Sequence, residues 1–377
     1  MHLVANQDQR LIRESAHRYF SKSSPVSAFR ALREQRDPLG YSESTWRELV
    51  ELGFPGLAIA EDDGGLGLGF FALGGALEEA GRTLCASPLL ATSGLGASAI
   101  ELAGTAEQRQ ELLPRICSQG LTLSLALDEA PHHAPDAIHT TARRTADGYR
   151  INGHKCFVID GHVADKLIVV ARRTDPVDSP SSLALFLVDR ETKGLEAEAL
   201  HMVDHRNLAH LHFHDVQVPA SAELPHADAS VLEQILDRAR ACLAAEMMGS
   251  IDEVFERTLS YLRERTQFGV RIGSFQALKH RAARLYTEIE LTRSSVAGAL
   301  AAIDGGASDT PALCALAKLR ANELSRLAGN EAIQMHGGIG VTDELDIGLF
   351  VKRSRTSMQQ FGDSRYLRDR FARLSGY

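Results

Sequence analysis

Two glycine-containing segments near the C-terminus carry residue types that could bind an extended, charged ligand. The segment Arg265–Gly269 places a cation and an aromatic ring beside a glycine turn, and Gln276 follows a few residues later. The segment Gln334–Gly340 contains the pair Gly337 and Gly338, where bare backbone would let a planar ligand approach closely. A helix–loop–helix turn with an arginine-anchored cap would explain either segment equally well, so neither segment alone decides between the two interpretations.

The histidines of one predicted strand could in principle hold a metal. His210, His212 and His214 alternate, which places three imidazoles on one face. Neighbours on that face lie about 7 Å apart, because a strand rises about 3.3 Å per residue, whereas zinc needs every ligand at about 2 Å from one centre. The sequence also contains no CxxC pair, P-loop, GxSxG or HExxH pattern. We therefore expect no metal site and interpret the histidines as a solvated strand face.

The composition excludes several classes of protein. The 377 residues include 41 basic and 49 acidic side chains, a net charge of −8. Nucleic-acid-binding proteins usually carry a basic stripe, so we expect no nucleic-acid partner. No run of about 18 apolar residues occurs, so we expect no membrane span. The N-terminal residues lack the apolar core of a signal peptide and the cysteines indicate no disulfide framework, which favours a cytoplasmic location.

The apolar spacing changes twice along the chain and predicts three domains that would position these residues. Residues 1–119 have helical periodicity, and residues 120–225 alternate with period two, beginning with a half-buried strand at Leu121–Asp128 and including a turn at 175–182. Residues 226–377 return to long helical repeats that end at glycines. We predict a mainly α chain with an N-terminal helical domain, a small central antiparallel β-barrel and a C-terminal four-helix bundle.

Taken together and in order, the motifs resemble the acyl-CoA dehydrogenase family. The resemblance covers essentially the whole chain, and its fold is the helix, barrel and bundle order predicted from periodicity. It rests on the two C-terminal segments and on Trp46–Gly56, Glu61–Gly67, Glu78–Arg82 and Gly153–Val158. It implies an FAD-dependent oxidoreductase of lipid catabolism that desaturates an acyl thioester such as acyl-CoA, with an acceptor like electron-transfer flavoprotein.

The resemblance also implies which residues bind the cofactor and the substrate. FAD would lie between barrel and bundle and be shared with a neighbouring subunit, which implies at least a dimer and usually a tetramer. Arginine suits the FAD pyrophosphate, because its planar guanidinium donates two parallel hydrogen bonds to phosphate oxygens. The residues matched to FAD positions are Arg265, Phe268, Gln276, Gln334, Gly337 and Gly338 in the bundle, and Leu127, Asp128, Phe157 and Val158 in the barrel. Asp237 and Arg240 match positions that contact the pantetheine chain of acyl-CoA.

The sequence departs from the family at the catalytic base. The family's reaction needs a carboxylate that removes the α-proton while the β-hydrogen leaves as hydride to the flavin. The usual glutamate position is Phe361 in this chain, and the alternative position on the long bundle helix is Ala239. Asp363 and Glu246 are the remaining carboxylate candidates, although Asp363 also suits a helix N-cap and Glu246 could belong to a buried structural pair.

Three explanations of this departure stay open. Asp363 or Glu246 could serve as the base. The chain could instead be the base-less subunit of a heteromeric dehydrogenase whose second subunit supplies the glutamate, as in relatives that act on sterol side chains or dicarboxylates. Thirdly, the flavin could perform other chemistry, or the chain could be a structural subunit that completes a partner's flavin site. We favour the second explanation, because the ending Phe361–Asp363 resembles such small subunits.

Overall fold

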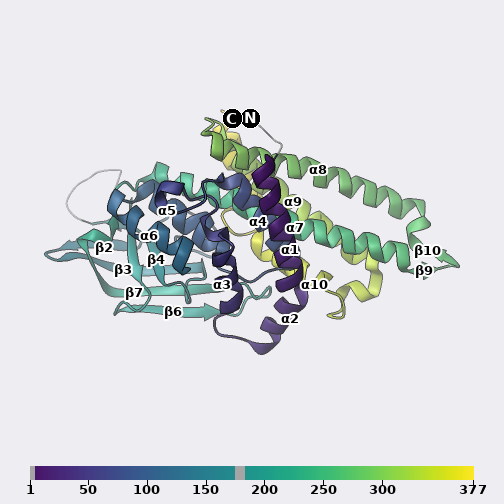
Figure 1. Ribbon diagram of the computed structural model, residues 1–377, viewed down its shortest axis with the longest axis horizontal. Helices are drawn as coiled ribbons and strands as arrows, with labels where there is room; N and C mark the ends of the chain where they lie inside the picture. Colours follow the sequence, from purple (N-terminus) through teal and green to yellow (C-terminus); the bar gives the residue numbers. More distant parts are fainter. Residues whose placement is uncertain (1–4, 175–182) are drawn as a thin grey trace. The chain divides into compact units, whose positions relative to one another are not determined.

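The computed structural model describes residues 5–174 and 183–377, and Figure 1 labels many of its helices and strands. The predicted turn at 175–182 lies outside the described residues. The chain forms two compact units, the first made of Met1–Glu34, Phe70–Cys85 and Arg240–Tyr377, the second of Gln35–Gly69 and Ala86–Ala239. Each unit therefore combines segments that are distant in sequence, and the domain boundaries 1–119, 120–225 and 226–377 stay a prediction.

The first unit is built from helices and one short hairpin. Helices α8 and α9 pack along each other, and α10 and α11 both contact α9. The C-terminal region is helical, as predicted, and a helix after Phe361 that the periodicity did not predict completes it. The elements are α1 (Gln7–Ser23), α2 (Val26–Gln35), α4 (Gly69–Thr83), most of α7 (Ala229–Glu264), β9 (Thr266–Gln267), β10 (Val270–Arg271), η5 (Ile272–Ser274), α8 (Gln276–Gly305), α9 (Thr310–His336), η6 (Gly337–Val341), α10 (Ile347–Ser357) and α11 (Ser364–Leu374).

Two glycines let helices α4 and α7 pack backbone against backbone. A Cβ added at Gly81 would lie 2.0 Å from the carbonyl oxygen of Glu246, and one added at Gly249 would lie 1.7 Å from that of Glu78. Neither helix could hold this position with a larger residue there, because real Cβ contacts are never so short. The buried hydroxyl of Ser250 also donates to the carbonyl oxygen of Gly81 at 2.9 Å. This close approach fixes the part of α7 that follows Arg240.

The second unit combines short helices with one mixed sheet. The sheet order is β6-β7-β3-β2-β4-β5-β8, and β1 pairs with β4. The helical elements are α3 (Glu43–Glu51), η1 (Phe54–Gly56), η2 (Glu61–Asp63), the π-helix η3 (Leu90–Gly96), α5 (Ala97–Ala103), α6 (Ala106–Gln119), η4 (Ala220–Ala222) and the first residues of α7. The strands are β1 (Leu123–Ala126), β2 (Thr141–Thr145), β3 (Gly148–Ile159), β4 (Lys166–Arg173), β5 (Leu183–Asp189), β6 (Leu195–Leu200), β7 (Leu208–Pro219) and β8 (Glu223–Leu224).

The predicted closed antiparallel barrel is wrong in two respects. Closure would require the end strands β6 and β8 to pair, and among the described residues the sheet is open, with those two strands at its edges. The strands β1 and β2 both run parallel to β4, so the sheet is mixed. The strand β1 is also buried at all four positions, because η3 packs against it. Its leucine alternation therefore did not mark one solvent-facing side.

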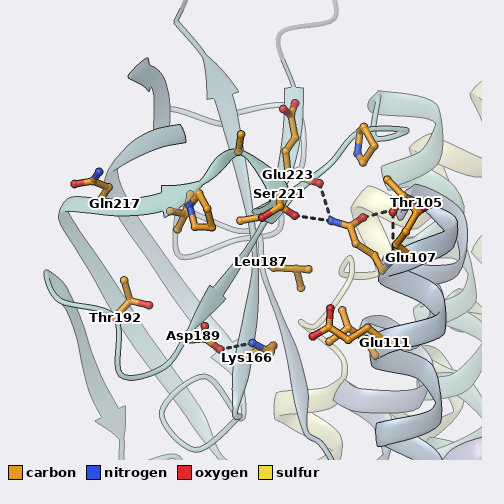
Figure 2. Close-up of a pocket in the computed structure, with 17 residues that line it drawn as sticks. Thr105, Glu107, Glu111, Lys166, Leu187, Asp189, Thr192, Gln217, Ser221 and Glu223 are labelled. Atoms are coloured by element: carbon orange, nitrogen blue, oxygen red, sulfur yellow. Dashed lines mark hydrogen bonds and ion pairs between the residues drawn. The ribbon is translucent and has the colours of Figure 1, made fainter. Parts of the chain in front are cut away.

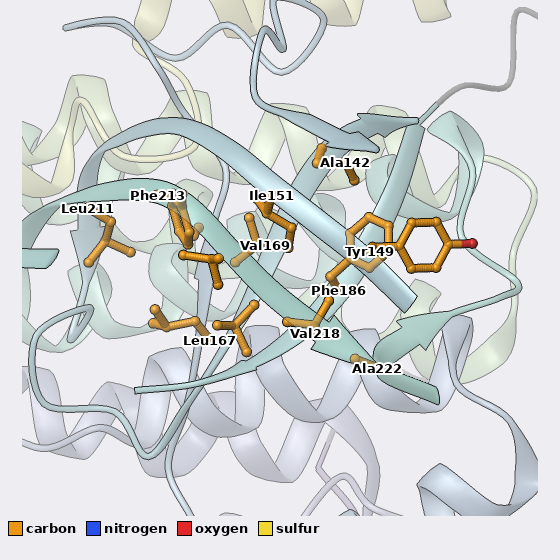
Figure 3. Packing of buried hydrophobic residues seen from close by; sticks show 14 of the residues in the cluster. Ala142, Tyr149, Ile151, Leu167, Val169, Phe186, Leu211, Phe213, Val218 and Ala222 are labelled. Atoms are coloured by element: carbon orange, nitrogen blue, oxygen red, sulfur yellow. The ribbon is translucent and has the colours of Figure 1, made fainter. Parts of the chain in front are cut away.

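The core of this unit lies against the sheet and combines alanine and valine with a few larger side chains (Figure 3). Tyr149 of β3 and Phe186 of β5 pack with ring centroids 4.8 Å apart, and Phe213 of β7 is buried in the same cluster. The core face of β3 continues the alternation from Tyr149 and Ile151 to Lys155, which is also buried. A lysine therefore stands at a position where the strand pattern requires a buried residue.

None of the described helices combines the length and the apolar character that crossing a membrane requires.

Candidate functional site

The segment after β1 carries two of the residues matched to FAD, and two carboxylates organise it. The Asp128 carboxylate accepts a hydrogen bond from the backbone N–H of Ala134 at 3.0 Å and lies 3.0 Å from Nδ1 of His133. The Glu129 carboxylate accepts from the backbone N–H groups of His139 at 2.6 Å and Thr140 at 2.9 Å. These contacts close residues 127–140, which we call the wall loop, on itself. Leu127 is buried, and Asp128 is partly exposed.

The other two FAD-matched residues of the sheet lie at a bulge in β3. The pairing with β7 shifts register between Lys155 and Val158, and Phe157 inside this bulge has φ 52°. A left-handed backbone costs a residue such as phenylalanine about 1–3 kcal/mol unless its surroundings hold it there. The backbone N–H of Cys156 donates to the Asp128 carbonyl oxygen at 2.7 Å and so ties the bulge to the wall loop. Phe157 is 39% exposed, which leaves a ring face available to a ligand.

A buried ion pair lies directly beneath the bulge. The Lys155 ammonium donates to Glu129 Oε1 at 2.7 Å and to the Leu127 carbonyl oxygen at 2.9 Å, and the two side chains are 0% and 3% exposed. Burial lowers the pKa of Lys155 to about 8, and the neighbouring Glu129 limits that fall. Burial alone would raise the pKa of Glu129, but Lys155 and the hydrogen bonds from Thr140 outweigh it and lower the pKa to about 2. The pair is therefore ionised at neutral pH.

In the helical unit, three predicted FAD residues surround the β9–β10 hairpin. Phe268 stands at its tip with φ 52°, is 91% exposed and touches Phe275 edge to face, with ring centroids 6.3 Å apart. Arg265 and Gln276 are exposed at the two ends of the hairpin segment. No described residue accepts a hydrogen bond from the Arg265 guanidinium. An exposed ring beside an unengaged cation suits a nucleotide with phosphates.

The end of α9 provides the remaining predicted FAD contacts. Gln334 is exposed in the last helical turn, and Gly337 terminates the helix with φ 68° and ψ −145°. A Cβ added at Gly337 or Gly338 would meet no described atom within 4 Å, so a ligand can reach this backbone. The aromatic tip, the free guanidinium and this open glycine pair fit a dinucleotide such as FAD. Their role as FAD ligands stays a prediction.

The position matched to the catalytic base lies in a turn between α10 and α11. Phe361 is half-buried with φ 58°, and Gly362 follows with φ 118°. The fully buried Arg240 donates from Nε to the Phe361 carbonyl oxygen at 3.0 Å and from Nη2 to the Tyr366 hydroxyl at 3.4 Å. The alternative base position, Ala239, is also fully buried. Neither position offers a proton acceptor.

A second buried lysine supports this turn from α9. Lys318 donates to the Ser357 carbonyl oxygen at 2.9 Å and to Asn322 Oδ1 at 2.5 Å. Asn322, one helical turn later, donates to the carbonyl oxygens of Met358 at 3.2 Å and Gly362 at 3.3 Å. These side chains satisfy carbonyl groups that the end of α10 leaves without helical partners. Burial lowers the pKa of Lys318 well below its usual value, and Arg240 lowers it further.

The two substitute carboxylates both have structural partners. Asp363 caps α11, because its Oδ1 accepts the backbone N–H of Tyr366 at 2.8 Å. Glu246 is buried on α7 and lies 3.9 Å from Nη1 of Arg353. Of the predicted substrate residues, Asp237 is buried, and Arg240 holds the turn as described above. The catalytic role of Asp363 and Glu246 and the substrate role of Asp237 and Arg240 stay predictions.

Four residues that shape these regions were not singled out from the sequence. Lys155, Glu129, Lys318 and Asn322 are buried or nearly so and hold the two segments that carry candidate residues. A usable signal existed for the lysines. Lys155 continues the core-facing alternation of its strand, and Lys318 and Asn322 fall four residues apart on the helix face of the buried Cys314.

The histidines of β7 form a row rather than a cluster. The rings of His212 and His214 stack with centroids 6.3 Å apart, His154 of β3 lies 6.5 Å from His212, and His210 meets Phe157 edge to face at 5.1 Å. The parallel rings do not converge on one point, and within residues 5–174 and 183–377 no three histidine, cysteine or carboxylate side chains could share a metal ion.

A cavity of about 660 Å³ lies in the sheet unit but contains none of the predicted site residues (Figure 2). It separates the start of α6 from β4, β5 and η4, and Gln108 bridges it by donating to the carbonyl oxygens of Ser221 and Glu223, both at 2.9 Å. Its charged lining includes Glu107, Glu111 and Asp189. An anionic CoA ester would be repelled there, so we do not place the substrate in this cavity.

Comparison with known proteins supports the resemblance to acyl-CoA dehydrogenases along the whole chain. The acyl-CoA dehydrogenase N-terminal, middle and C-terminal domain models match residues 6–120, 132–216 and 229–375. The chain is 32% identical over 358 residues to the probable acyl-CoA dehydrogenase YngJ of Bacillus subtilis, with 92% of both chains covered. A variant of a steroid ACAD of known structure is 32% identical, with a TM-score of 0.88 and 98% of both chains covered.

A further solved structure, the ChsE4-ChsE5 complex from Mycobacterium tuberculosis, has a TM-score of 0.90 over 100% of both chains. At 23% identity it shows the common fold alone. The three matched domains and the 32% identity to YngJ decide the family. This chain belongs to the acyl-CoA dehydrogenase family, whose members are FAD-dependent oxidoreductases that act on the CH–CH groups of acyl-CoA substrates.

Proposed function

We propose that this chain is the base-less, FAD-binding subunit of a heteromeric acyl-CoA dehydrogenase, and that a second subunit of the same family supplies the catalytic glutamate. The observation that carries the proposal is the turn at Phe361. Its side chain cannot accept a proton, while its backbone is held by Arg240 at 3.0 Å. The turn is therefore held in place by a hydrogen bond, but it has no carboxylate at position 361 to act as the base.

The engagement of the two other carboxylates supports the same conclusion. A general base must be free to reach the α-proton of the substrate. The Asp363 carboxylate accepts the backbone N–H of Tyr366 in the first turn of α11, and Glu246 is buried beside Arg353. Using either group as a base would disturb a helix cap or withdraw a carboxylate that lies 3.9 Å from a buried arginine.

The cofactor half of the proposal rests on the residues that match the FAD positions of the family. Bound FAD would supply a hydride acceptor. Arg265 would meet its pyrophosphate, Phe268 and the open backbone at Gly337 would lie along its nucleotide end, and Phe157 would cover a ring face. The chain carries a net charge of −8, so local cations such as Arg265 must offset an unfavourable overall field for anionic ligands.

The proposed partners follow from the family. They are an acyl-CoA or similar thioester, an acceptor like electron-transfer flavoprotein, and a second family subunit in a dimer or tetramer. The 32% identity to the steroid ACAD structure, whose name pairs two proteins, Tcur3481 and Tcur3483, supports the heteromeric arrangement. The acyl chain identity is left open, and the cytoplasmic location stays a prediction.

Visible spectroscopy of the purified chain tests the proposal. We expect the chain alone to give no bleaching of flavin absorbance when a panel of acyl-CoA esters is added anaerobically. Co-expression with a family member that retains the glutamate should yield a stable complex that bleaches. A chain that bleaches by itself would contradict the proposal and restore Asp363 or Glu246 as base.

Two charge-removing variants then identify a base in that case. Asp363→Asn keeps the helix cap, because asparagine caps as well as aspartate, and Glu246→Gln keeps the side-chain shape. Loss of bleaching in one variant but not the other would assign the base. A chain that is yellow in every combination yet never bleaches would favour the structural-subunit alternative or a different flavin reaction.

A further inference from the structure

The wall loop and the bulge of β3 are joined by one buried side chain. The Lys155 ammonium bonds the Leu127 carbonyl oxygen at 2.9 Å and Glu129 Oε1 at 2.7 Å, so it holds both the start of the wall loop and its second carboxylate. Lys155 also lies two residues before Phe157 on the same strand. One ammonium thus fixes the positions of residues from two separate segments.

The Glu129 carboxylate extends this hold to the far end of the wall loop. It accepts the backbone N–H groups of His139 and Thr140 in addition to the lysine. Thr140 precedes β2, so the pair connects the end of β1, the start of β2 and the middle of β3. A further bond, from the N–H of Cys156 to the carbonyl oxygen of Asp128 at 2.7 Å, joins the residue next to Lys155 to the residue next to Glu129.

The pair itself cannot touch a ligand. Its side chains are 0% and 3% exposed, whereas Phe157 is 39% exposed and Asp128 is partly exposed. Phe157 adopts φ 52°, a conformation that phenylalanine keeps only where neighbouring contacts hold the backbone. One of those contacts, the bond from the Cys156 N–H to the Asp128 carbonyl oxygen, comes from the wall loop, and the wall loop is held by the pair.

We propose that Lys155 and Glu129 are a positioning pair, which sets Leu127, Asp128 and Phe157 as one preformed surface for the flavin. The inference rests on the proposed FAD role of those three residues. Neither member of the pair contacts the cofactor, so its effect is on the fit of the surface rather than on the chemistry. Preforming the surface lowers the cost of ordering it when FAD binds.

Variants of the full-length chain separate positioning from simple stability. Lys155→Met removes the charge and both donors, and Lys155→Arg keeps a charged donor. The double variant Lys155→Met/Glu129→Gln leaves no unpaired buried charge, which should restore much of the melting temperature. Lys166→Met is the matched control, because Lys166 forms an exposed ion pair with Asp189 in the same sheet.

Two readouts decide the outcome. Hydrogen exchange should show faster exchange at Ala134, His139, Thr140 and Cys156 in Lys155→Met and in the double variant, and no change in Lys166→Met. FAD titration, followed by flavin fluorescence and visible circular dichroism, should show at least tenfold weaker binding and an altered dichroism band in the same two variants. Partial recovery is expected in Lys155→Arg.

The results distinguish this inference from the proposed function. If the double variant regains thermal stability together with wild-type exchange and dichroism, the pair is only structural and the inference is wrong. Unchanged hydrogen exchange in the wall loop of Lys155→Met would also contradict the inference, whether or not FAD binding changes. A wild-type chain that takes up no FAD, alone or with a family partner, would instead overturn the proposed cofactor site.

Discussion

Two fully buried lysines hold the two segments in which function is expected, and they do so in different ways. Lys155 in the sheet unit pairs with a carboxylate at 2.7 Å, while the acceptors recorded for Lys318 in the helical unit are a carbonyl and an amide oxygen. Burial lowers the pKa of Lys155 to about 8, with Glu129 opposing the fall, and burial also lowers the pKa of Lys318 well below its usual value. The wall loop is thus organised by a charge pair, and the Phe361 turn by donors to backbone carbonyls.

The difference teaches where this chain could change without losing its fold. The Phe361 turn is held by its backbone, through Arg240, Lys318 and Asn322, so the side chain at 361 is free to vary. In the wall loop the carboxylate of Glu129 is itself a structural element. Loss of an acid is therefore tolerated at the turn and would be costly in the wall loop.

The largest effect should come from returning an acid to the turn. Phe361→Glu places a carboxylate on a backbone that Arg240 and Asn322 already hold, and a positioned general base is worth about 10²–10⁴-fold in rate. We expect the variant alone to bleach bound flavin anaerobically with an acyl-CoA that leaves the wild type yellow. Phe361→Gln, of similar size but without a base, is the control.

Two outcomes of that experiment would break the comparison. Equal bleaching by the glutamine variant would show that size, not proton transfer, matters at position 361. A glutamate variant that loses the thermal stability of the wild type would show that the phenylalanine ring, and not only the backbone contacts, holds the turn.

Matched substitutions of the two lysines should give unequal losses of stability. Lys155→Met leaves Glu129 as an unpaired buried charge and should lower the free energy of unfolding by about 3–5 kcal/mol. Lys318→Met leaves neutral acceptors without a donor, which should cost about 1–3 kcal/mol. Denaturant titration at neutral pH measures both, and Lys166→Met, at an exposed pair, should change the value by less than about 1 kcal/mol.

Equal losses in Lys155→Met and Lys318→Met would contradict this account. In that case the protonated form of Lys318 would be stabilised by its surroundings to a similar degree, and the contrast between a charge pair and carbonyl contacts would disappear. A larger loss of unfolding free energy in Lys318→Met would show that the Phe361 turn, and not the wall loop, depends more on its buried lysine.

The sequence predicted much of what is local and little of what depends on pairing. Helical periodicity and glycine ends identified the long helices, and Asp363 was foreseen as a possible cap, because these signals act within a few residues. Closure of the sheet was mispredicted, since turn residues do not encode whether β6 and β8 meet. The parallel pairing of β1 with β4 joins residues about forty positions apart and left no local signal.

The burial of the two lysines could not be predicted for a related reason. Lysine is usually exposed, so its residue type favours a surface position. Only the strand and helix patterns place Lys155 and Lys318 inward, and the patterns do not reveal which acceptor each will meet. The partners Glu129 and Ser357 lie 26 and 39 positions away, and their contacts follow from the fold.

The last expected effect is a change in acid stability that reports on Glu129 alone. Its pKa is lowered to about 2 from an unfolded value near 4.5. Its contribution is therefore complete above about pH 4.5 and is lost as the pH falls through about 2, because only the unfolded state binds the proton in between. Wild type should lose up to about 3 kcal/mol from this group over that window, whereas Glu129→Gln should lack this slope.

An exposed carboxylate with a similar pKa provides the control for that measurement. Asp343 pairs with Arg33 at 3.1 Å, and its pKa is also lowered to about 2, but its side chain is 55% exposed. Water and salt screen such a pair, so Asp343→Asn should change the acid slope far less than Glu129→Gln. Equal changes would mean that the wall loop opens to solvent before the protein unfolds. The buried pair would then stabilise the loop no more than a surface ion pair does. The claim that the Lys155–Glu129 pair organises the wall loop would be wrong.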